Sequence, residues 1–159
     1  MTEIASLIDT LAAQERALVF PTFDEDAALE IGVQLVTAAR REDAPVVIDI
    51  RTPDRVLFHA ALPGSTPDND HWARRKSNVT LRYHRASMRV GEAMRAKGQV
   101  VGPDLGLDPL DFANHGGSFP VRIKDSVVVA AITVSGLASI DDHNMIVAVL
   151  EAYLGIGSV

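Results

Sequence analysis

The stretch SFPVRIKDSVVVAAITVSG (residues 118–136) decides the fold that the rest of the chain must complete. Two segments rich in branched apolar residues are separated by Lys124, Asp125 and Ser126, which predict a tight turn. The pattern is typical of a β-hairpin. Its second segment is apolar on both faces, which is expected of a strand that is covered from above and below. We expect this strand to lie in the centre of an antiparallel sheet.

A second hairpin is predicted earlier in the chain. The segments APVVIDI (44–50) and RVLFHAAL (55–62) are separated by RTPD, a proline-containing turn. A short apolar stretch at 18–20 predicts one further strand. Hairpin-linked strands form an antiparallel sheet, which excludes the doubly wound dinucleotide fold; its G-x-G-x-x-G fingerprint is missing as well.

Four helices are expected to cover this sheet. Apolar residues recur at helical spacing within 4–11 and within 28–39. Gly91 is the only glycine or proline within 70–97, so one long helix is predicted there. SIDD (139–142) has the form of a capping box that opens a last helix, with the Ser139 hydroxyl capping the first turn and Asp142 reaching back. The element order is therefore helix, strand, helix, hairpin, helix, hairpin, helix.

Composition limits the function classes. A chain of 159 residues that is 47% hydrophobic buries roughly 70% of its unfolded surface in one core, so a single domain over residues 1–159 is expected. The net charge of −6 disfavours nucleic acid and anionic membranes as partners. No cysteine is present, which excludes disulfides and cysteine-ligated metals. The first residues carry acids and do not resemble a signal peptide, so a cytoplasmic protein is expected.

A cluster of cations is the first candidate site. Eight of the 15 Lys and Arg residues lie between Arg74 and Lys97, where only Glu92 opposes them. Helical periodicity places Arg75 or Lys76 on the inward stripe, in a position expected to be apolar. One reading is a solvated face whose charges meet acids of neighbouring elements or subunits. The other is an anion site for carboxylate or phosphate groups, centred on Arg75 and Lys76.

His143 interrupts the apolar stripe of the last helix in the same way. A lone histidine on such a face is often a core residue whose ring is hydrogen-bonded through one nitrogen. Alternatively, Asp142 and His143 close a pocket near the helix N-terminus, where the dipole stabilises a carboxylate and an imidazole acts as base or ligand. His59, on the earlier hairpin, is a weaker candidate.

The segment NHGGSFP (114–120) places paired glycines directly before a predicted core strand. Gly116 and Gly117 permit positive φ angles and close backbone approach, so one reading is a sharp bend that delivers the strand to the sheet. In the other, the bend exposes backbone N–H groups as an anion-binding nest, with His115 beside it. Ser135, with Asp142 and His143, has the composition of a hydrolytic triad, but no hydrolase motif surrounds it.

Three segments together resemble one family: HWARRKSNVTLRYHRAS (71–87), HGGSFPVRI (115–123) and ITVSGLASIDDH (132–143). They are similar to the haem-degrading-domain superfamily, known also from GlcG-like and HbpS-like proteins, and match best its UPF0303 branch. The resemblance implies an α+β fold, a profilin-like or PAS-like α/β/α sandwich around a five-stranded antiparallel sheet flanked by helices. It implies homo-oligomers such as octamers or decamers, and binding of haem or another tetrapyrrole. The family motifs fall on these positions: Arg75, Lys76, His115, Gly116, Gly117, Ser135, Gly136, Asp142 and His143.

Three functions follow as hypotheses. In the first, a homo-oligomeric protein binds a small anionic molecule or tetrapyrrole without turnover; Arg75 and Lys76 bind carboxylates such as haem propionates, and His115, or failing that His143, approaches the iron. In the second, the protein is a haem-degrading oxidoreductase. In the third, it is an assembly module without ligand, in which Arg75 or Lys76 pairs with Asp142 and His143 is a core residue.

Overall fold

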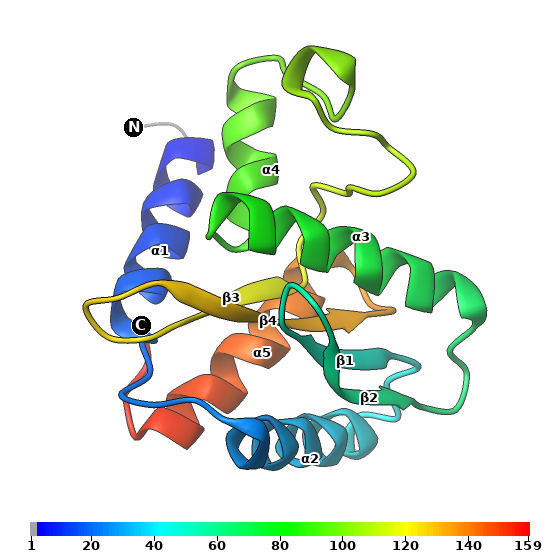
Figure 1. Ribbon diagram of the computed structural model, residues 1–159, viewed down its shortest axis with the longest axis vertical. Helices are drawn as coiled ribbons and strands as arrows, with labels where there is room; N and C mark the ends of the chain where they lie inside the picture. Colours follow the sequence, from blue (N-terminus) through cyan, green and yellow to red (C-terminus); the bar gives the residue numbers. More distant parts are fainter. Residues whose placement is uncertain (1–2) are drawn as a thin grey trace.

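The computed structural model describes residues 3–159. Pairs of helices and pairs of strands follow one another along the chain, in an order close to the expected one (Figure 1). Their bounds are α1 Glu3–Ala17, α2 Glu25–Arg41, β1 Val47–Arg51, β2 Val56–Ala61, α3 Pro67–Tyr83, α4 Ser87–Ala96, a 3-10 turn Pro103–Leu105, β3 Ser118–Arg122, β4 Val128–Ser135 and α5 Ser139–Leu154.

The sheet has the strand order β2-β1-β4-β3, and every neighbouring pair is antiparallel. Both predicted hairpins are confirmed, and β4 lies in the interior of the sheet as expected. The expected fifth strand is wrong: Phe20 forms one isolated bridge to Ile123, and the chain bends at Pro21, after which no further pairing follows before α2. Pro120 lies on β3, where an edge strand tolerates a residue without an N–H group.

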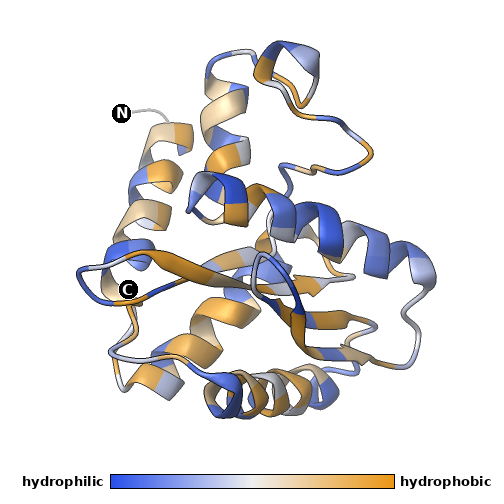
Figure 2. Cartoon of the chain, in the orientation of Figure 1, coloured by the Kyte–Doolittle hydropathy of each residue, from blue (hydrophilic) through white to orange (hydrophobic). Residues whose placement is uncertain are grey.

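The fold is a three-layer α+β sandwich. Helix α3 crosses one face of the sheet, and α2 and α5 cover the other (Figure 1). Side chains alternate along each strand, so Ile48, Ile50 and Ile132 join the core beneath the sheet while Asp49 and Thr133 point toward α3. Figure 2 shows the same division, with mostly hydrophobic strands and a largely hydrophilic α3. The polar side of the sheet faces the cation-rich helix.

The single long helix predicted over 70–97 is wrong. Helix α3 ends at Tyr83, His84 adopts a left-handed backbone with φ of 57°, and α4 begins at Ser87. The Glu15 carboxylate of α1 accepts a hydrogen bond from the backbone N–H of Ala86, just before α4. The break turns α4 so that it packs against α1, a contact that a straight helix lying across the sheet would not make.

The predicted capping box at the last helix is also wrong. Ser139 is the first helical residue of α5 and makes no capping hydrogen bond, since the cap position is occupied by Ala138. Asp142 does reach back, but it accepts hydrogen bonds from the N–H groups of Gly136 and Leu137 in the preceding turn. The carboxylate therefore orders the β4–α5 connection.

Within residues 3–159, no helix combines the length and apolarity that crossing a bilayer requires. The single domain expected over residues 1–159 stays a prediction, and its first two residues lie outside the described part of the chain.

Candidate functional site

A buried ion pair joins α3, the glycine bend and α5. The Lys76 Nζ donates to the Gly116 carbonyl at 3.1 Å, to the Val134 carbonyl at 2.7 Å and to Asp142 Oδ2 at 3.2 Å. Both charged side chains are 3% exposed. Because an ammonium carries three protons, these three acceptors use all of them. Of the two cations that periodicity placed inward, Lys76 is the buried one.

Burial and pairing shift the pKa values of Lys76 and Asp142 in opposite directions. Burial lowers the pKa of Lys76, and the neighbouring Asp142 carboxylate counteracts this effect. Burial likewise raises the pKa of Asp142, against the influence of Lys76 and of two backbone N–H groups. Each partner thus depends on the other to stay charged in a site that excludes water.

The glycine bend is shaped around this pair. Gly117 has φ of +126°, and a Cβ atom there would collide with the Lys76 ammonium and with the Val134 carbonyl. A Cβ on Gly116 would lie 2.7 Å from the Ser139 carbonyl. Paired glycines are therefore required so that the Gly116 carbonyl reaches the lysine. The bend presents a carbonyl oxygen to a cation.

A recess of about 280 Å³ opens beside the ion pair. Its lining includes Trp72, Lys76, His115, Ser135, Gly136 and Asp142. The structure thus brings together most of the residues that the sequence singled out, although they come from four separate segments of the chain. Among residues 3–159, no group of three or more His, Asp or Glu side chains is placed to hold a metal ion.

The rim of the recess carries an aromatic and cationic group of side chains. The His115 ring packs edge-on against Trp72, with 5.0 Å between ring centroids. The Arg75 guanidinium lies over the Trp72 ring, 4.6 Å from its centroid, and its Nε donates to the Pro109 carbonyl at 3.0 Å. Arg75 is therefore oriented by the protein but keeps its terminal nitrogens for other acceptors.

His115 is a histidine at the rim whose surroundings favour the neutral form. Partial burial lowers its pKa, and the nearby Arg95, Lys76 and Arg75 charges lower it further. Within the described residues, no hydrogen bond involves its ring. A neutral imidazole without a partner retains a lone pair that can bind a metal or accept a proton.

His143 lies elsewhere. It is fully buried between α5 and α1, where its Nε2 donates to Gln14 Oε1 at 2.7 Å, while its Nδ1 has no hydrogen-bond partner among the described residues. Burial lowers the pKa of His143 to about 4. The geometry matches the reading of a core histidine bonded through one nitrogen, and it separates His143 from the recess despite its position next to Asp142.

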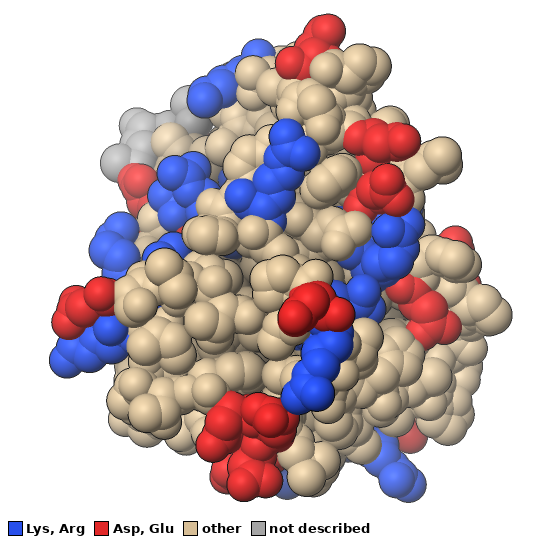
Figure 3. Space-filling model, viewed as in Figure 1, with Lys and Arg blue, Asp and Glu red and all other residues tan. Residues whose placement is uncertain are grey.

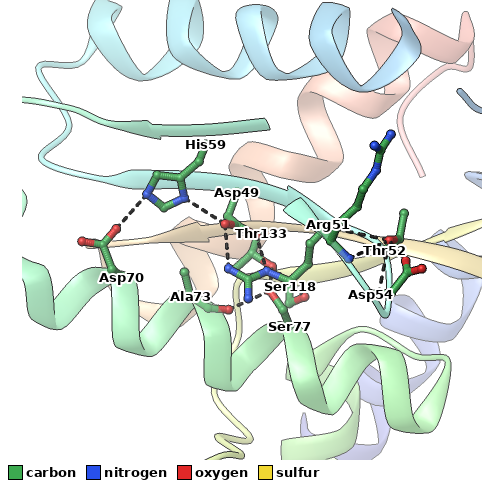
Figure 4. A network of polar contacts seen from close by, with 11 residues as sticks. Asp49, Arg51, Thr52, Asp54, His59, Asp70, Ala73, Ser77, Ser118 and Thr133 are labelled. Carbon is green, nitrogen blue, oxygen red and sulfur yellow. Dashed lines mark hydrogen bonds and ion pairs between the residues drawn. The ribbon is translucent and has the colours of Figure 1, made fainter. Parts of the chain in front are cut away.

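A second polar cluster was missed by the sequence reasoning. Asp49 is fully buried on β1, where it accepts two hydrogen bonds from Arg51, at 2.6 and 2.7 Å. Its Oδ2 also lies 2.8 Å from His59 Nδ1, and His59 Nε2 lies 2.8 Å from Asp70 of α3 (Figure 4). The available signal was a charged residue inside the apolar run VIDI, which the hairpin register places opposite His59.

A chain of buried hydroxyls continues this polar side of the sheet. Ser77 of α3 contacts the Thr133 hydroxyl at 2.8 Å, and Thr133 donates to Ser118 at 2.9 Å (Figure 4). The strand register places Asp49 and Ser118 on either side of Thr133. Hydroxyls let the layer between α3 and the sheet stay polar without unpaired charge, because a hydroxyl is able both to donate and to accept.

The fold and site define a class: an α+β sandwich in which a buried Lys–Asp pair supports a small recess edged by a free histidine. Residues 23–151 match the family described as haem degrading protein, HbpS-like. A UPF0303 protein of Streptomyces coelicolor is 49% identical over 151 residues, covering 95% of this chain and 96% of that protein. One of Streptomyces avermitilis is 47% identical over 156 residues, covering 97% and 96%. The chain therefore belongs to the HbpS-like family, in its UPF0303 branch, as the three motifs predicted.

Solved structures have the same fold. The crystal structure of the Ybr137w protein superposes with a TM-score of 0.81 at 29% identity and covers 93% of this chain and 87% of that one. HbpS superposes with a TM-score of 0.67 at 22% identity, covering 84% and 90%. A PduOC complex with heme gives 0.67 at 17% identity, covering 86% and 96%. Because HbpS and PduOC share only 22% and 17% of their residues with this chain, these two comparisons show a common fold and nothing more.

Proposed function

We propose that this chain is a small-molecule binding protein whose recess takes an anionic ligand, with haem or another tetrapyrrole as the first candidate. The observation that carries the proposal is the placement of His115: its ring packs against Trp72 beside the Arg75 guanidinium, and within residues 3–159 its nitrogens form no hydrogen bond. Membership of the HbpS-like family and a fold shared with a PduOC–heme complex support haem as the candidate.

The residues present fit the donors that haem requires. A neutral imidazole is a haem-iron ligand, and a guanidinium with free terminal nitrogens binds propionate carboxylates. The recess of about 280 Å³ lies just below the roughly 300–1,000 Å³ of most ligand pockets, so it encloses only part of a macrocycle. The rest of the ring would lie on the exposed rim or against a second copy of the chain.

The roles of the predicted residues differ in this proposal. Arg75 contacts the carboxylate, whereas Lys76 contributes its positive charge from beneath, because the protein already uses its three protons. Gly116, Gly117 and Asp142 hold Lys76 in place. His115, at the rim, is the proposed iron contact rather than the fully buried His143.

An absorption titration with hemin tests the proposal. The wild-type protein is expected to give a saturable, stoichiometric shift of the Soret band, and His115→Ala is expected to lose it. His71→Ala is the matched control, because His71 is an exposed histidine of α3 that does not line the recess. A shift that survives in His115→Ala, or one that is lost equally in His71→Ala, would contradict the assignment.

The same titration separates binding from turnover. Bound haem would supply an iron centre that activates oxygen, and the alternative of a haem-degrading oxidoreductase predicts that the Soret band decays when reductant and oxygen are added. A band that persists under these conditions supports binding without turnover. Iron release that depends on His115 supports the enzyme.

Self-assembly is a second candidate function, supported by a specific surface. A groove of about 700 Å³ runs between α2 and α5, and α2 exposes Leu29 and Val33, at 55% and 52%, one turn apart. We propose that this surface joins copies of the chain in a homo-oligomer. Octamers or decamers, like a cytoplasmic location, stay predictions.

A further inference from the structure

A separate groove of about 590 Å³ lies between α1, α4 and the β3–β4 turn. It shares no residue with the His115 recess. Four cations and two acids line it: Arg16, Arg89, Arg122 and Lys124 against Glu15 and Asp125. Figure 3 shows Lys and Arg side chains gathered on this side of the molecule, to the left of the view. In a chain with a net charge of −6, this groove has an unusual excess of positive charge.

Two of the four cations are held rigidly in the wall of the groove. The Arg122 guanidinium donates to the His84 carbonyl at 3.1 Å and to the Ser126 carbonyl at 3.3 Å, so it bridges the α3–α4 break and the β3–β4 turn. Arg89 donates to the buried Glu15 carboxylate at 3.0 Å. Neither set of contacts uses all five guanidinium protons, and both fix the direction in which the remaining ones point.

The other two cations are not paired with an acid in the described part of the chain. Arg16 on α1 and Lys124 in the turn are exposed, and neither forms an ion pair within residues 3–159. The cations on α3 differ, since Arg74 pairs with Asp111 and Lys76 with Asp142. Of the positive surface predicted between residues 74 and 97, Arg89 and Arg95 on α4 also meet acids. The unpaired cations of the groove therefore come from outside that range, at Arg16 and Lys124.

We propose that this groove binds the phosphate chain of a small phosphorylated molecule with two or more consecutive phosphates. Arginines oriented by the protein, Arg122 by backbone carbonyls and Arg89 by Glu15, offer forked N–H donors that match phosphate oxygens. The unpaired cations at the rim add charge without the cost of breaking an internal pair. A groove of this volume suits a short chain of phosphates rather than a long polyanion. The inference goes beyond the haem proposal and rests on different residues.

Calorimetric titration with inorganic triphosphate tests this inference on the whole protein. One equivalent is expected to bind, with an affinity that falls as salt is raised. The double variant Arg16→Gln, Lys124→Gln is expected to weaken binding by about tenfold or more, which corresponds to about 1.4 kcal/mol. Both side chains are exposed and form no hydrogen bond or ion pair within residues 3–159, so the variant is expected to fold.

A matched variant controls for overall charge. Arg55→Gln, Lys97→Gln removes two exposed cations that do not line the groove, together with the exposed Arg55–Glu25 ion pair, and is expected to leave the dissociation constant within about twofold. An equal loss in both variants, or no saturable binding to the wild type, would overturn the inference. So would a change in oligomer mass in the groove variant without triphosphate binding, because the groove would then be a contact between copies. Binding of ATP more tightly than triphosphate would identify a nucleotide, and equal binding would identify the phosphate chain itself.

Discussion

At the scale of single residues, Lys76 explains why the family motifs occur together. Its ammonium lies at the point where the glycine bend, the end of β4 and the start of α5 converge, and each segment supplies one acceptor. The acceptor on Asp142 is 66 residues away in sequence. Motifs that look independent along the chain are therefore parts of one buried polar contact.

Replacing Lys76 by methionine is predicted to destabilise the protein strongly. Lys76→Met leaves the Asp142 carboxylate buried without its cation, which costs roughly 3–5 kcal/mol of unfolding free energy. Adding Asp142→Asn should restore part of this loss, since an amide oxygen still accepts from the turn N–H groups. Denaturant unfolding measures both variants.

A control for this prediction lies on the same helix. Arg74→Met removes an ion pair to Asp111 that is about half exposed, so we expect a loss of about 1 kcal/mol or less. If Lys76→Met is no more costly than Arg74→Met, the buried pair does not stabilise the fold as argued.

At the scale of elements, α1 is held in place by polar contacts as well as apolar packing. Gln14 accepts a hydrogen bond from His143 of α5, and Glu15 contacts Arg89 and the backbone that precedes α4. The two acceptors, Gln14 and Glu15, are neighbouring residues of α1. Protonating His143 keeps its bond to Gln14 but buries a charge between α5 and α1, which is unfavourable.

The cost of burying this charge predicts an acid-sensitive stability. Burial lowers the pKa of His143 from 6.5 to about 4, so between these values the unfolded chain binds a proton that the folded protein does not. The stabilisation from the neutral ring is complete above pH 6.5, and it is lost as the pH falls toward 4, by roughly 3 kcal/mol in total. Unfolding measured at about pH 7.5 and about pH 5 should show the decline.

The variant His143→Gln isolates this contribution from that of other acids. Glutamine keeps an N–H donor for Gln14 but does not titrate, so its unfolding free energy should fall less between the two pH values. Parallel declines in wild type and variant would show that His143 is not the group responsible.

At the scale of the whole molecule, the α2–α5 groove predicts how the chain associates. Val33→Glu places a charge on the surface proposed to join copies, and burying it there is unfavourable. Light scattering is expected to show a mass that falls toward the 17.1 kDa of one chain. Val100 lies in the loop that follows α4, outside the α2–α5 groove, and is 75% exposed. The control variant Val100→Glu should therefore leave the mass unchanged. Equal masses for wild type and Val33→Glu would place the contact elsewhere.

Two features of the fold could not be predicted from local sequence patterns. The expected helix over 70–97 failed because the left-handed conformation at His84 and the Glu15 contact at Ala86 come from tertiary packing, with no proline or glycine to mark the break. The Asp49–His59 pair was missed because strand register, which places the two side chains opposite each other, depends on the turn between β1 and β2.

By itself, the sequence determined the antiparallel hairpins, the interior position of β4, the family and the inward placement of a cation on α3. Alternation and helical periodicity are local properties, and they are enough to decide which faces are buried. Only the tertiary structure decided that Lys76 rather than Arg75 is inside, that Asp142 is its partner, and that His115 lies at the recess while His143 does not. These choices depend on which distant segments meet, because a buried charge is tolerated only where the fold brings its acceptors together.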